Sequence, residues 1–209
     1  MIKVISCDNK NYIKKLNIFL DKRRQGKKFD TKIVSNIISE VKKNKLKALL
    51  KFEKKYSKNR NIKPSKIQIR SSIQKLDPKV KKAIDFAHNR ILKFHSKQLK
   101  NLKNIVYKDK YNNKLEYKNI PIQSVGIYVP SNLPSTLLMN SIPAKLAKVK
   151  RLVLATPKIN GKLNPAVLYA AKKVGIKEIY SFGGAQAIAS LAYIQKVDKV
   201  VGPGNKFVA

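Results

Sequence analysis

Three short loops carry residue types suited to binding phosphates or flat rings. They span residues 126–130, 182–187 and 201–205, and each follows an apolar run typical of a buried strand. A glycine pair such as Gly183-Gly184 lets the backbone approach a phosphate, and free N–H groups at a helix start face such an anion. Gln186 and Asn205 add amides that donate and accept hydrogen bonds. Taken singly, each loop is explained as well by a tight turn that binds nothing.

The side chains give little support for a metal site, a disulfide or a catalytic triad. His88 and His95 are seven residues apart on one expected helix, whereas paired metal ligands on a helix usually stand three or four apart. We therefore expect ordinary packing or solvent roles for both. Cys7 is the single cysteine, which excludes an internal disulfide and a thiolate metal cluster. No Ser-His-Asp order and no carboxylate pair stands out.

The elements that position the three loops alternate between strand and helix. Strands are expected over 124–129, 152–155, 178–182 and 199–201, with helices over 135–149, 164–174 and 185–193 between them. Such spacing requires crossover connections, and hence a parallel sheet covered on both faces. The predicted fold class is α/β with a Rossmann-like parallel sheet. In such sheets ligands bind beyond the carboxyl ends of the strands, where the three loops lie.

The preceding part of the chain is mostly helical in pattern. Seven of the eight glycines follow residue 120, which marks a change of composition. Asp30 or Thr31 caps one expected helix that extends to Phe52, and Asp77 caps a second that begins at Pro78. A short strand is expected over 67–70, a polar hairpin over 107–120 and an amphipathic helix over 10–19. We predict a helical arm (1–25), the first part of another α/β domain (26–123) and a Rossmann-like domain (124–209).

The charge is strongly positive, with 47 Lys and Arg against 11 Asp and Glu, a formal net charge of +36. Such a charge suggests nucleic acid as a partner, because basic groups on phosphates release counterions. Only six of the basic residues are Arg, however, and the lysines are scattered. A codon bias across the genome explains them better than specific nucleic-acid recognition. No apolar run is long enough for a bilayer span, and residues 1–8 do not read as a secretory signal, so we expect a cytoplasmic protein.

Four motifs become specific when they are taken together. They are VGIYVP at 125–130, LMNSIPAK at 138–145, GGAQAIA at 183–189 and KVDKVVGPGN at 196–205. In order and approximate spacing this set resembles histidinol dehydrogenase. Asp77-Pro78 and Phe94-His95 upstream are also similar to that family, so the resemblance covers nearly the whole sequence. The loops at 131–134 and 194–195 are shorter than is usual in the family.

The resemblance implies an enzyme that oxidises L-histidinol to L-histidine in two successive NAD-dependent steps, the last step of histidine biosynthesis. It implies that Tyr128, Gln186 and Asn205 contact NAD, and that a zinc ion binds the substrate. The family's zinc ligands and its catalytic Glu and His lie beyond the GPGN motif. We therefore expect no catalytic residue and no metal ligand in this sequence, which would be an N-terminal portion, inactive alone, of a homodimeric enzyme.

Two other functions stay open at this level. The chain could be a non-catalytic binding or assembly module, or a split half that needs a C-terminal partner. It could also be a basic nucleic-acid-binding protein, an interpretation motivated only by its charge.

Overall fold

The central sheet has four parallel strands, as the alternation of strands and helices predicts. A computed structural model describes residues 11–24, 31–99 and 103–204. The strands are β3 (Ser124–Tyr128), β4 (Arg151–Ala155), β5 (Glu178–Tyr180) and β6 (Lys199–Val201), in the spatial order β5-β4-β3-β6. They are connected by α5 (Pro134–Leu146), α6 (Pro165–Lys173) and α7 (Gly184–Tyr193). The predicted Rossmann-like α/β fold is confirmed.

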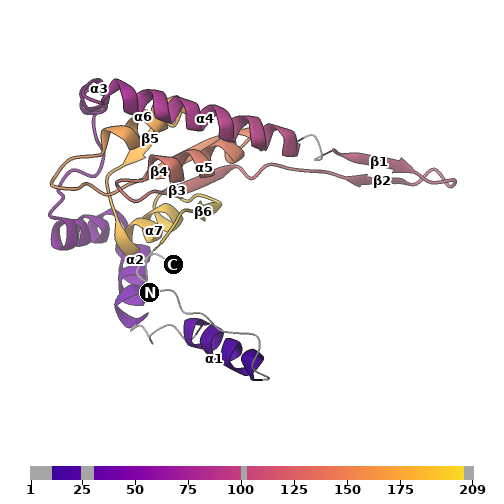
Figure 1. Cartoon of the computed structure of the whole chain (residues 1–209), viewed down its shortest axis with the longest axis horizontal. Helices are drawn as coiled ribbons and strands as arrows, with labels where there is room; N and C mark the ends of the chain where they lie inside the picture. The colour runs from indigo at the N-terminus through magenta and orange to yellow at the C-terminus, as the bar shows by residue number, and fades with distance from the viewer. Residues whose placement is uncertain (1–10, 25–30, 100–102, 205–209) are drawn as a thin grey trace.

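The direction of strand addition reverses between β3 and β6. The chain adds β4 and β5 on one side of β3, and then returns to add β6 on the other side. Helices α5 and α6 lie on one face of the sheet, and α7 lies on the opposite face (Figure 1). Such a reversal opens a crevice at the carboxyl ends of the strands, where ligands bind in open α/β sheets. Tyr128 ends β3 at this point, and Gly202 follows β6.

Alternate residues of β3 serve the two faces of the sheet. Val125 and Ile127 belong to the larger apolar core under α4, α5 and α6, whereas Tyr128 packs with Leu191 and Phe182 on the α7 face. Gly126 also faces α7, and a Cβ there would lie 3.0 Å from Leu191 Cδ2. The helix can therefore lie close to the strand.

Two long helices before residue 100 pack directly on this sheet unit. Helix α2 (Thr31–Ser57) lies against α7, and α4 (Pro78–Leu99) crosses α5 and α6. The apolar stripe expected on each early helix is thus partly buried against the later half of the chain, since Val41 and Ile84 are buried whereas Leu46 and Phe94 are exposed. Helix α2 kinks at Lys45, whose φ is 46°. Asp77 caps α4 as predicted, since its Oδ1 accepts a 2.7 Å bond from the Lys79 N–H.

Two details of the predicted elements change. Residues 67–70 are not a strand but part of α3 (Lys66–Gln74). A capping box starts this helix: Ser65 Oγ accepts from the Gln68 N–H, and Gln68 Oε1 accepts from the Ser65 N–H. Thr31 is the first residue of α2 rather than its cap, and Asp30 lies outside the described residues.

Two elements extend away from the body (Figure 1). Helix α1 (Tyr12–Arg24) falls within the predicted arm. The hairpin of β1 (Ile105–Lys108) and β2 (Lys114–Tyr117) matches the predicted polar hairpin but begins two residues earlier. All eight strand residues of the hairpin are exposed. Among the described residues, no helix combines the length and apolar character that a membrane crossing requires. The predicted division at residue 124 stays a prediction.

Candidate functional site

A cavity of about 480 Å³ opens on the α7 face of the sheet, beside the end of β3. Helix α2 forms one wall, and the turn before α7 forms the other. The lining is largely apolar, with the hydroxyl of Tyr128 and the amide of Gln186 among its polar groups. The residues around it are Ile33, Ile37, Tyr56, Ser57, Tyr128, Pro157, Gly183, Gly184, Ala185 and Gln186. A concave, mostly apolar site with a few polar groups is typical of small-molecule binding.

The glycine pair is required by the geometry of the turn. A Cβ on Gly183 would lie 2.8 Å from Cβ of Pro157, which is too close for any other residue. Gly184 has a φ of +64°, a left-handed conformation that glycine adopts readily. The turn therefore brings backbone, rather than side chains, to the wall of the cavity.

Glu53 lies buried beneath this turn, although sequence reasoning did not select it. Only 1% of its surface is exposed. Its Oε1 accepts a 2.8 Å bond from Gln186 Nε2 and a 3.2 Å bond from the Gly183 N–H. Helical periodicity could have indicated that Glu53 is buried, because it follows the buried Leu49 by four positions and so faces the core side of α2.

Tyr128 completes the polar groups of the cavity. Burial raises the pKa of its hydroxyl, the N–H of Gly184 that bonds to the oxygen lowers it, and the nearby Glu53 carboxylate raises it again. The net effect is upward, so the phenol keeps its proton at neutral pH. Tyr128 can therefore donate a hydrogen bond into the cavity.

Two of the three predicted site residues come together here. Tyr128 and Gln186, 58 positions apart in the sequence, line the same cavity. Asn205 lies outside the described residues. The loop that precedes it reaches the same edge of the sheet, because a Cβ on Gly202 would lie 2.1 Å from the carbonyl oxygen of Tyr128.

The residues present fit a dinucleotide better than a metal ion. The cavity has room for a ring, an apolar wall and polar atoms of both kinds, since Tyr128 donates and Gln186 Oε1 accepts. Zinc does not fit, because the described ranges hold no cluster of three or more His, Cys, Asp or Glu side chains. His88 and His95 bond instead to neighbours on α4, Asn89 and Gln98 respectively.

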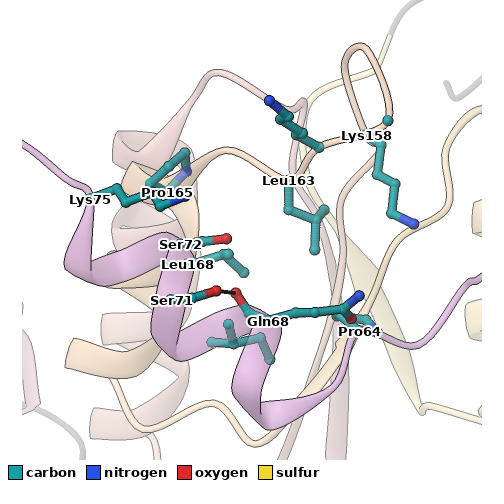
Figure 2. Close-up of a pocket in the computed structure, with 12 residues that line it drawn as sticks. Pro64, Gln68, Ser71, Ser72, Lys75, Lys158, Leu163, Pro165 and Leu168 are labelled. Carbon is teal, nitrogen blue, oxygen red and sulfur yellow. Dashed lines mark hydrogen bonds between the residues drawn. The ribbon is translucent and has the colours of Figure 1, made fainter.

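A second cavity, of about 360 Å³, lies between α3 and the segment that leads into α6 (Figure 2). Three of its polar side chains, those of Gln68, Ser71 and Lys158, form hydrogen bonds within the protein. Ser71 Oγ donates to the Gln68 carbonyl at 3.1 Å, and Lys158 Nζ donates to Asn59 Oδ1 and to the Asn61 carbonyl. This cavity therefore offers less chemistry than the one beside Tyr128.

Comparison with known proteins agrees with the geometry. The histidinol dehydrogenase family model matches residues 20–209. The chain is 56% identical, over 216 aligned residues, to the histidinol dehydrogenase of Pelagibacter ubique (strain HTCC1062), and the match covers all of this chain and 50% of that protein. It is 38% identical to the Caulobacter vibrioides (strain ATCC 19089 / CIP 103742 / CB 15) histidinol dehydrogenase, covering 91% of this chain and 46% of that one.

A solved structure gives the same result. The crystal structure of histidinol dehydrogenase from Elizabethkingia anophelis superposes with a TM-score of 0.80 at 36% identity, over 88% of this chain and 44% of that chain. The present chain thus spans about half the length of the relatives that it matches. The family model and these alignments cover most of the chain, and it belongs to the histidinol dehydrogenase family.

Proposed function

We propose that this chain is the N-terminal, cofactor-contacting part of an NAD-dependent histidinol dehydrogenase. The complete enzyme would oxidise L-histidinol to L-histidine in two successive steps, the last of histidine biosynthesis, in the cytoplasm. Family membership supports the activity. The observation that carries the assignment of this half is the cavity that Tyr128 and Gln186 share at the carboxyl end of β3.

The residues of this chain would bind and orient the cofactor. When bound, NAD supplies a hydride acceptor for an alcohol and then for an aldehyde. Ile33, Ile37 and Tyr56 give a ring an apolar surface, while Tyr128 and Gln186 give it a donor and an acceptor. Asn205 stays the third proposed contact.

The remaining chemistry belongs, in this proposal, to the part of the family that this chain does not span. That part would supply the zinc ligands and the acid–base residues, and the complete enzyme would be a homodimer. No step through zinc is assigned to the described residues, since they hold no group that fits it. We propose neither a membrane nor a specific nucleic acid as a partner.

Reconstitution tests this function. The 209-residue chain is assayed for NAD reduction with L-histidinol, alone and after co-expression with the C-terminal half of the Pelagibacter ubique relative. We expect no turnover alone and turnover by the pair. In the pair, Gln186→Ala raises the KM for NAD about tenfold, the cost of one lost hydrogen bond at a buried site. Gln74→Ala, at an exposed position of α3, is the matched control and leaves it unchanged.

Two outcomes would contradict the proposal. Turnover by the chain alone would mean that the catalytic groups lie within these 209 residues. A stable complex of the two halves with no turnover would mean that the pair is not a histidinol dehydrogenase.

A further inference from the structure

The orientation of the Gln186 amide is decided by Glu53. The Oε1 atom of Glu53 already receives the Gly183 N–H at 3.2 Å, so this oxygen acts as a hydrogen-bond acceptor. The atom of Gln186 that lies 2.8 Å from this oxygen must therefore be the donor, Nε2. The other atom of the amide, the acceptor Oε1, is turned away from Glu53.

This acceptor is left without a partner. Gln186 is 3% exposed, and no described residue donates a hydrogen bond to its Oε1. The oxygen lies on the Gly184 side, 3.0 Å from the position that a Cβ on Gly184 would occupy, and both residues line the cavity. The oxygen is open to the cavity rather than sealed within the protein, so a ligand that enters the cavity can donate a hydrogen bond to it.

The same contacts argue against a phosphate at this turn. Glu53 takes the Gly183 N–H, so one of the amides that would cradle an anion is used internally. A phosphate would also face the buried charge of Glu53. The group that fits beside Gln186 is uncharged or cationic.

We propose that Glu53 is a positioning residue that sets Gln186 as a hydrogen-bond acceptor, and that this acceptor selects an N–H donor on a flat ring. The inference rests on the proposed dinucleotide function and adds to it the polarity of the contact. NAD has two such donors, the amino group of its adenine and the carboxamide of its nicotinamide. The carboxamide and the amino group share this chemistry, and binding measurements distinguish them.

The binding test uses the full 209-residue chain with three dinucleotides: NAD, its hypoxanthine analogue, which lacks the adenine amino group, and its nicotinic acid analogue, which lacks the carboxamide N–H. We expect one analogue to bind about tenfold or more weakly than NAD by calorimetry, because it leaves Oε1 unpaired. The analogue that loses affinity identifies the donor. Affinities for all three within about twofold of one another would overturn the selection.

Variants of Glu53 separate positioning from mere packing. Glu53→Gln keeps an oxygen that can accept both bonds, so discrimination between NAD and the weaker analogue is retained. Glu53→Met has similar length but no acceptor, which frees the Gln186 amide to turn, and discrimination falls to about twofold or less. Gln186→Met also loses the discrimination between NAD and the weaker analogue, although Glu53 is unchanged in this variant. Glu40→Met, on the same helix outside the cavity, is the control. Discrimination that persists in Glu53→Met would overturn the role of Glu53.

An NMR measurement tests the positioning without any ligand. The side-chain amide protons of Gln186 and the Gly183 N–H, both bonded to the carboxylate, should shift strongly in Glu53→Met and little in Glu53→Gln. Unchanged resonances in Glu53→Met would overturn the positioning, whatever binds. Failure of the wild-type chain to bind any of the three dinucleotides would overturn the ligand assignment and the proposed function of this half, while the NMR result still decides the role of Glu53.

Discussion

At the scale of single residues, the Asp198 carboxylate joins the start of β3 to the turn before β6. Its Oδ2 accepts from the Ser124 N–H at 2.7 Å and from the Ser124 hydroxyl at 2.9 Å, and the Asp198 N–H donates back to Ser124 Oγ at 3.1 Å. The hydroxyl bond, followed by the backbone bond, lowers the pKa of Asp198 below its ordinary value. Its ionised form therefore contributes stability above the pKa of the unfolded chain, and this contribution is lost as the pH falls through the folded pKa.

We expect Asp198→Asn to lower the melting temperature at neutral pH, and to have a smaller effect in acid, below the lowered pKa of Asp198, where the wild-type side chain is also uncharged. Thermal melts of both proteins across this range measure the difference. Glu40→Gln removes one acid from α2 and controls for net charge. An equal loss at both pH values would show that the charge of Asp198 is not what stabilises the junction.

The residues of the candidate site also differ in how far the sequence alone could identify them. Tyr128 and Gln186 were assigned by the family resemblance, and both lie on loops that the strand and glycine pattern picks out at one edge of the sheet. Glu53 was missed because its role depends on α2 packing against α7, which joins positions 133 apart in the sequence. Periodicity could mark it as a buried acid, but it could not name its partner.

At the scale of elements, Gly202 decides how closely β6 approaches β3. Its φ is +144°, and an added Cβ would lie 2.1 Å from the Tyr128 carbonyl oxygen. Gly202→Ala should destabilise the fold by about 1–3 kcal/mol from the backbone conformation alone, with the clash adding to this. Gly161→Ala is the matched control, because its φ is +74° but nothing lies within 4 Å of the new methyl. Denaturant titrations compare the two, and equal losses would show that β6 does not need this contact.

The starts of α6 and α3 show where residues close in sequence are enough to predict a helix. Helix α6 begins at Pro165, one residue after the expected start, and Asn164 caps it, since its side chain accepts from the Ala166 N–H at 2.8 Å. The alternation of Ile67 and Ile69 instead suggested a strand, and over four residues that pattern is ambiguous. The capping box at Ser65 and Gln68 resolves it in favour of α3. The capping box, whose two residues are three positions apart, was therefore a stronger signal than the short alternation of Ile67 and Ile69.

At the scale of the whole molecule, the charge of +36 predicts diffuse rather than specific binding of polyanions. Pairs such as Arg151–Glu178 and Lys173–Asp85, each at 2.8 Å, engage only a few of the basic side chains. We expect affinity for a labelled random DNA duplex to fall about tenfold or more between low and physiological salt, with no preference among sequences. Fluorescence anisotropy at several salt concentrations tests this. Tight binding at physiological salt that depends on sequence would revive a nucleic-acid function.

The strand order also affects how the chain assembles as it is synthesised. β3 is the first strand of the parallel sheet to be made and β6 the last, with the paired Ser124 and Asp198 separated by 74 positions. Until β6 is available, the nascent sheet has β3 at its edge, with unpaired N–H and C=O groups that another chain can pair with. Contacts this distant in sequence also form slowly. Addition of β6 therefore replaces an edge strand of five residues by one of three, which offers fewer unpaired backbone groups to another chain. A chaperone that shields β3 would act before that point.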